Sequence, residues 1–146
     1  MLFLVDANVL IYTRDFRDST KQQAATGWIK ALAEQNAAIV NLQVLNEVCE
    51  VALRKLRHLS QVEVRRWIAD LAAFGDTYLD AEIVEAAWAI QSRYRFNWFD
   101  CLILGSADHL GCSHVLTEDM GAPRRVGPLT LVNPFSARPG DVLSAS

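Results

Sequence analysis

The hydrophobic residues of this chain follow two spacings that predict two kinds of element. Short apolar runs are typical of buried strands, whereas apolar residues three and four positions apart are typical of one helix face. The short runs predict strands over residues 2–5, 38–41, 77–79, 115–117 and 129–132. The helical spacing predicts helices over about 20–35, 42–57, 61–74, 81–94 and 98–110.

Several predicted helices are bounded by residues that commonly begin or end helices. Ser60 and Glu63 have the spacing of a capping box, and Ser19 or Thr20 is suited to cap the first long helix. Gly75 follows the helix that the capping box begins, and glycine commonly ends helices. Strands that alternate with helices favour a parallel sheet with helices on both faces. We therefore predict the α/β fold class.

Length and composition predict a single domain. A chain of 146 residues with 51% hydrophobic content is sufficient for one substantial core, which we place in residues 1–135. Residues 136–146 are rich in Ser, Ala, Pro and Gly and are predicted to be a flexible tail. No apolar stretch reaches the roughly 18 residues of a membrane span. Since the N-terminus also lacks a signal-peptide pattern, we expect a cytoplasmic protein without membrane contact.

Charge and cysteine content narrow the function classes. The net charge of -3 argues against a protein that coats nucleic acid by charge alone. It does not exclude a nuclease, because bound cations offset the charge of a carboxylate site. The three cysteines, Cys49, Cys101 and Cys112, lack paired spacing, so we interpret them as core residues rather than a zinc or disulfide framework.

Two acidic residues follow predicted strands. Asp6 ends the first apolar run, and Asp119 lies just beyond the run that ends at Thr117. The carboxyl ends of parallel strands meet at one edge of an open sheet, which is the usual place for ligands. An alternative for Asp6 is a purely structural role as the N-cap of a short helix over residues 8–12.

Two further acidic residues lie in predicted helices. Glu47 is on the face opposite the apolar side of its helix, where it can point toward Asp6; a surface pair with Arg54 is the alternative. Asp100 lies among large apolar residues, where a carboxylate has to be paired, act as a cap or bind a metal. Together, Asp6, Glu47, Asp100 and Asp119 form a set of four carboxylates without a neighbouring cation in sequence. Such a set is typical of a divalent-metal site.

The sequence around these four positions resembles the PIN-domain ribonucleases of the VapC toxin type. The resemblance extends over about residues 2–135 and consists of four acidic motifs in order, followed by a final strand. The motifs are Val5-Asp6-Ala7-Asn8-Val9-Leu10, Gln43-Val44-Leu45-Asn46-Glu47, Phe99-Asp100-Cys101-Leu102-Ile103 and Leu116-Thr117-Glu118-Asp119-Met120.

This resemblance implies a three-layer α/β/α sandwich around a parallel sheet of about five strands. It also implies a metal-dependent endoribonuclease that is the toxin of a toxin–antitoxin pair, with Mg²⁺ as the ion and Mn²⁺ as a substitute. Hard oxygen ligands agree with that choice of metal. The implied catalytic and metal-binding residues are Asp6, Glu47, Asp100 and Asp119. The implied supporting residues are Asn8, Thr117 and Glu118, of which Glu118 is an alternative to Asp119 as a ligand.

The resemblance further implies three partners: an RNA substrate, a cognate antitoxin and a second copy of the chain. A helix-lined groove would receive the antitoxin, and its candidate walls also fit an ordinary core. Cationic residues near the site are candidates for holding RNA, although each basic cluster alone is typical of a solvated face. The groove candidates are Trp28, Ile29, Leu32, Trp67, Ile68 and Leu71. The RNA-binding candidates are Arg14, Arg17, Arg54 and Lys55, with Arg57 beside them.

Two other function classes stay open. A Mg²⁺-dependent phosphatase or phosphotransferase also places an Asp after its first strand, but it would want a second Asp at position 8 and a late lysine. Here Asn8 occupies that position, and no lysine follows Lys55. A non-catalytic regulatory domain would use the carboxylates to receive a partner's arginine. A catalytic histidine is not expected, since all three histidines lie outside the acidic motifs.

Overall fold

The computed structural model describes residues 1–75 and 77–144. A five-stranded sheet has the order β2-β1-β3-β5-β4. Four of its strands are parallel, as predicted: β1 (Phe3–Val5), β2 (Ala38–Ile39), β3 (His114–Leu116) and β5 (Leu129–Val132). The edge strand β4 (Arg124–Val126) is antiparallel to β5. The carboxyl ends of β1 and β3 therefore lie side by side, which brings two of the acidic motifs together.

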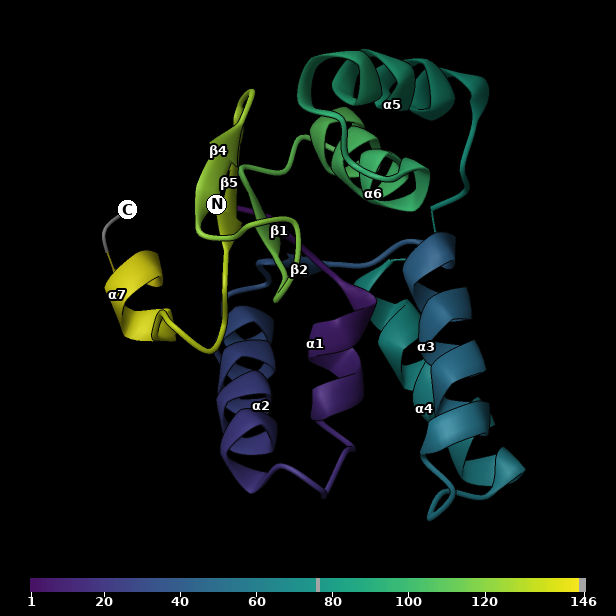
Figure 1. Cartoon of the computed structure of the whole chain (residues 1–146). Coiled ribbons are helices and arrows are strands. Elements are labelled where there is room, and N and C mark those ends of the chain that lie inside the picture. The colour runs from purple at the N-terminus through teal and green to yellow at the C-terminus, as the bar shows by residue number, and fades with distance from the viewer. Residues whose placement is uncertain (76, 145–146) are drawn as a thin grey trace.

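Helices cover both sides of this sheet and complete the predicted α/β architecture. Figure 1 shows α5 and α6 on one side and α1 to α4 on the other, with α7 beside α2. The helices are α1 (Ala7–Tyr12), α2 (Ser19–Glu34), α3 (Leu42–Lys55), α4 (Gln61–Leu71), α5 (Ala81–Tyr94), α6 (Trp98–His109) and α7 (Pro139–Leu143). None of the described helices is both long and apolar enough to cross a membrane.

The helix boundaries follow the predicted capping residues with one change. The Ser60 hydroxyl accepts a hydrogen bond from the Glu63 amide at 3.2 Å, and the Glu63 carboxylate accepts one from the Ser60 amide at 2.6 Å. This is the predicted capping box. The N-cap of α2 is Asp18 instead of Ser19 or Thr20, because the Asp18 carboxylate accepts from the Lys21 amide.

The core lies between the sheet and its helices. Its largest fully buried side chains include Phe3 and Leu4 of β1, Leu116 of β3 and Trp28 of α2. The prediction for the cysteines is confirmed for Cys101 and Cys112, which are buried thiols, while Cys49 is half-buried.

The structure corrects two expectations about short segments and places a helix in a third segment. Residues 77–79 form no strand; Thr77 makes a single bridge to Asn41. Strand β4 was not predicted, because its arginines are exposed and only Val126 is buried. In the tail that was predicted to be flexible, α7 packs near α2, Leu143 is buried and the Trp28 indole donates to the Ala137 carbonyl at 2.9 Å. Residues 145 and 146 of that tail lie outside the described residues.

Candidate active site

Asp6 directly follows β1, and both of its carboxylate oxygens accept hydrogen bonds. Its Oδ1 accepts a hydrogen bond from the Ala7 amide at 2.7 Å, so Asp6 is the N-cap of α1 as the structural alternative proposed. Its Oδ2 accepts from the hydroxyl of Thr117, at the end of β3, at 2.8 Å. The Asp6 side chain is thus buried at the junction of two parallel strands, and the same carboxylate lines the adjacent cleft.

Asn8 connects Asp6 to Asp119. Its Nδ2 donates to Asp6 Oδ2 at 3.3 Å and to Asp119 Oδ2 at 3.0 Å, while its Oδ1 accepts from the Glu118 amide at 3.3 Å. The Asp119 amide donates to Thr117 Oγ1 at 3.0 Å. A neutral amide in the first turn of α1 therefore fixes the turn that follows β3 and orients two carboxylates.

Glu47 reaches the same cleft from α3. Gln43, one helical turn earlier, donates from Nε2 both to Glu47 Oε1 at 3.2 Å and to the Phe99 carbonyl at 3.1 Å. The predicted alternative partner, Arg54, instead pairs with Glu50 at 2.7 Å. Glu47 is therefore oriented by an amide rather than neutralised by a cation.

Asp100 lies in the first turn of α6, where the helix dipole favours a negative charge. The N-cap Asn97 accepts from the Asp100 amide at 2.9 Å and donates to Asp100 Oδ2 at 2.7 Å. The carboxylate is half-buried, and the hydrogen bond from Asn97 supplies part of the pairing that we expected for it. Sequence reasoning missed Asn97 and Gln43 as supports for the carboxylates, although Asn97 occupies a recognisable N-cap position.

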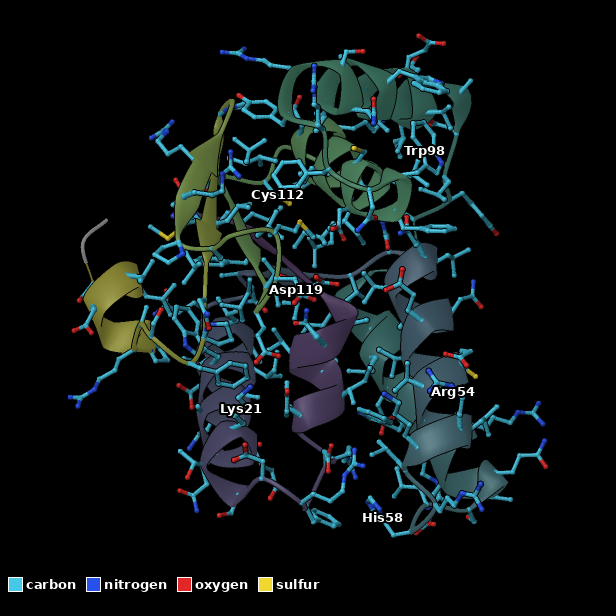
Figure 2. The ribbon with its side chains drawn as sticks, viewed as in Figure 1. Lys21, Arg54, His58, Trp98, Cys112 and Asp119 are labelled. Atoms are coloured by element: carbon cyan, nitrogen blue, oxygen red, sulfur yellow. The ribbon has the colours of Figure 1, made fainter. Side chains whose placement is uncertain are left out.

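The four carboxylates line one cleft of about 660 Å³. Figure 2 shows Asp119 at the centre of the molecule, where the ribbons of α1, α3 and α6 come near one another. None of the four forms an ion pair with a described Lys, Arg or His. Four acidic groups from four separate segments thus share a concave site whose lining contains no cation among the described residues.

Burial and mutual repulsion make three of these groups harder to ionise, namely Asp6, Glu47 and Asp100. Burial raises the pKa of Asp6 to about 6, against hydrogen bonds from Thr117 and Ala7, and the charges of Glu47 and Asp100 raise it further. Burial, with the charge of Asp100, also raises the pKa of Glu47. Burial followed by the charge of Asp119 raises the pKa of Asp100. A bound cation would relieve the repulsion and favour the charged forms.

Glu118 is directed away from this cleft. It pairs with Lys21 of α2, whose ammonium also lies 3.2 Å from the Tyr12 hydroxyl and 4.9 Å from the ring centres of Tyr12 and Phe135. Glu118 does not line the cleft, whereas Asp119 does. Sequence reasoning missed Lys21 because it is 97 residues from its partner. The geometry thus favours Asp119 over Glu118 as the fourth member of the set.

The predicted RNA-binding cations lie outside the cleft lining. Arg54 contacts the cleft lining indirectly, because it pairs with Glu50 and Glu50 lines the cleft. Arg17 pairs with Asp15 at 2.7 Å, and Arg14 lies over the ring of Trp67 at 5.4 Å. Lys55 is exposed at the end of α3, and Arg57 is exposed just beyond it.

The helix-lined groove expected from the resemblance is present in part. Trp28 and Leu32 are fully buried core residues, as the alternative interpretation held. Ile29, Trp67 and Leu71 line a separate hollow of about 590 Å³ bordered by α2 and α4, although Trp67 and Leu71 are themselves buried in the core.

The residues of the cleft fit a hard divalent ion that keeps much of its water. Among the described residues, no three acidic, histidine or cysteine side chains converge closely enough to hold an ion by themselves. Mg²⁺ is usually bound through only one or two carboxylates, with waters and substrate oxygens completing its shell. The absence of an ion pair at the four carboxylates and the raised pKa values of Asp6, Glu47 and Asp100 agree with such a site. Asp6, Glu47, Asp100 and Asp119 are the residues that would hold the ion.

The sequence model of the PIN domain matches residues 3–127, which include all four carboxylates. The chain belongs to the PIN domain family. A comparison of this PIN domain with curated proteins gives no match.

Solved structures of similar fold come from toxin–antitoxin systems. A chain of a toxin–antitoxin complex from Klebsiella pneumoniae is 21% identical with a TM-score of 0.65, over 90% of this chain and 96% of that chain. A chain of VapBC2 from Rickettsia felis, bound to a DNA fragment from its promoter, is 14% identical with a TM-score of 0.66, over 91% and 98%. VapC20 of Mycobacterium tuberculosis, a sarcin–ricin loop cleaving toxin, is 17% identical with a TM-score of 0.60, over 85% and 96%. At such identities the likeness establishes the fold of this PIN domain, and its function has to be argued from the site.

Proposed function

We propose that this PIN domain is a Mg²⁺- or Mn²⁺-dependent endoribonuclease and the toxin of a toxin–antitoxin pair. The observation that supports it best is the set of four unpaired carboxylates, from four segments, in one cleft of a PIN fold. Because no Ser, Cys or His among the described residues lines this cleft, a covalent intermediate on such a side chain is not part of the proposal.

In this proposal each side chain of the site has a defined task. Asp6, Glu47, Asp100 and Asp119 would hold the ion, which supplies positive charge at the phosphate and lowers the pKa of an attacking water. Thr117 and Asn8 orient Asp6, and Asn8 also orients Asp119. The cleft walls position the phosphodiester, and the proton lost by the water would pass to a carboxylate or to solvent.

The partner proposals rest on separate features. For the antitoxin, we assign the hollow lined by Ile29, Trp67 and Leu71, because apolar side chains form half of its lining, it borders two helices and it is distinct from the carboxylate cleft. The similar structures of toxin–antitoxin complexes support a partner of this kind. Homodimer formation remains an expectation from the resemblance, and a cytoplasmic location remains an expectation from the sequence pattern.

The first test of the proposed function is Asp100→Asn. This change removes a charge while keeping the shape of the side chain. We expect RNA cleavage with Mg²⁺ or Mn²⁺ to fall by at least about 100-fold, because loss of a group that only supports a metal ligand already costs about 10- to 100-fold. Cleavage of total RNA is the readout, and circular dichroism should show an intact fold.

Asp108→Asn is the matched control, because Asp108 is exposed on the same helix and does not line the cleft. That variant should cleave like the wild type. Full activity in Asp100→Asn would refute the assigned site, and a wild type inactive with both ions would refute the proposed nuclease.

A further inference from the structure

The cleft that contains the carboxylates also has an apolar wall. Phe99, the residue before Asp100, lines it with a side chain left 64% exposed, and Leu79 lines it at 40%. Asn46 of α3 also lines the cleft and is exposed. One concave site therefore places an open aromatic ring and a polar amide directly beside acidic groups.

The position of Phe99 is fixed by the backbone around it. Its carbonyl accepts from Gln43 Nε2 at 3.1 Å, and the next amide, that of Asp100, donates to the N-cap Asn97. The preceding residue, Trp98, packs on Trp88 with ring centres 4.6 Å apart. Within the described part of the chain, no aromatic ring or cation covers Phe99, so its faces are available to a ligand.

An exposed aromatic ring on a backbone held by hydrogen bonds, next to the proposed phosphate-cleaving site, matches the chemistry of an unpaired nucleotide. A nucleotide joins a flat base to its phosphate through one sugar, so a phosphate at the carboxylates brings its base near the neighbouring wall. Unpaired bases stack on aromatic side chains, and such stacking contributes about 1–3 kcal/mol per base. Bases within a duplex already stack on each other and do not offer a face.

We propose that Phe99, with Leu79 and Asn46 beside it, forms a subsite for an unpaired base next to the phosphate that is cut. The subsite deepens the proposed function, on which it rests, because it selects RNA that is single-stranded at the cleavage point. Phe99 stacks on the base, Leu79 excludes water from the edge of the stack, and the Asn46 amide is placed to hydrogen-bond a base edge.

The test compares Phe99→Ala and Phe99→Trp with the wild type on an unstructured RNA oligonucleotide whose cleavage point has been mapped. Loss of stacking should raise KM for Phe99→Ala by about 5- to 150-fold, the equivalent of 1–3 kcal/mol. The value of kcat should change little, because a base stack contributes to ground state and transition state alike. Phe99→Trp retains an aromatic face and should keep a KM near that of the wild type.

Phe16→Ala is the matched control. Phe16 is exposed to a similar degree, 61%, but lies in the loop between α1 and α2 and does not line the carboxylate cleft. We expect it to leave KM unchanged. The Mn²⁺-induced rise in melting temperature should be the same in all four proteins, since the metal-holding carboxylates are intact.

An abasic substrate tests the contact directly. Removing the base next to the cut should weaken the wild type but leave Phe99→Ala unaffected, because that variant has no stack left to lose. An additive loss in Phe99→Ala would overturn the subsite. So would an unchanged KM in that variant, or a change in its oligomeric state, measured by light scattering, that accounts for the raised KM. A wild type that cuts no RNA would refute the proposed function instead.

Discussion

At the residue scale, Asp6 combines a structural and a chemical role. It caps α1, accepts from Thr117 and is only 6% exposed, yet it lines an acidic cleft. Because burial raises its pKa to about 6, the folded protein binds the Asp6 proton more tightly than the unfolded chain does. The unfolding free energy should therefore fall as pH rises from about 4 through about 6, then level off.

This argument predicts that Asp6→Asn stabilises the metal-free protein at pH 7. The gain is at most about 3 kcal/mol, for a pKa displaced by about two units, and it should be absent near pH 4. Urea unfolding across this pH range measures the gain in stability.

Mn²⁺ should raise the melting temperature of the wild type by binding only the folded state, and Asp6→Asn should lose most of that rise. An equal rise in both proteins would place the metal elsewhere.

At the element scale, the packing of α6 on α5 positions the two site residues of α6. The two helices approach closely at Gly105, where an added Cβ would lie 3.1 Å from Ala87 N and from Ile83 O. These are backbone atoms of α5, which cannot move without shifting the helix. The start of α6, with Phe99 and Asp100, is thus set by a contact about one and a half turns farther along the helix.

We predict that Gly105→Ala destabilises the fold by about 1–3 kcal/mol despite the better helix propensity of alanine. The control is Gly27→Ala in α2, where nothing lies within 4 Å of the added Cβ and stability should rise by up to about 1 kcal/mol. Thermal unfolding of both variants is the measurement. Equal stabilisation in the two would show that α5 and α6 are not in the close contact described.

At the scale of the whole molecule, an acidic protein has to bind a polyanion. The net charge is -3 and the cleft adds local negative charge, so cations outside the cleft have to hold the RNA backbone. Arg54 and Lys55 are on α3, the helix of Glu47, and Arg54 contacts a residue of the cleft lining. Arg14 and Arg17 follow the far end of α1 and already have Trp67 and Asp15 as partners.

We therefore predict different salt dependences for two double variants. Arg54→Gln with Lys55→Gln should raise KM for RNA and reduce the slope of log KM against log salt by up to about 1.4, at about 0.7 per phosphate contact. Arg14→Gln with Arg17→Gln should reduce it less. Metal affinity, measured by Mn²⁺-dependent melting, is the control and should not change. Unchanged slopes in both would place the RNA path on another face.

The sequence by itself determined the alternation of elements and the four acidic positions. Apolar periodicity depends on local burial, so it located the parallel strands and the long helices. The acidic residues stood out because each follows a buried strand or lies in a helix beside apolar residues. Apolar periodicity did not predict elements that lack a periodic pattern. These are β4, whose arginines are exposed, and α7, whose residues are typical of a loop.

Only the tertiary structure decided which groups meet. The Lys21–Glu118 pair, the Asn8 bridge from Asp6 to Asp119 and the contact of Gln43 with the Phe99 carbonyl each join segments far apart in the chain. Which of two adjacent acids faces the cleft depends on the turn after β3, and which of two adjacent aromatics stays open depends on how α6 packs on α5. Local sequence preference does not specify such choices, because chain packing at long range sets the direction of each side chain.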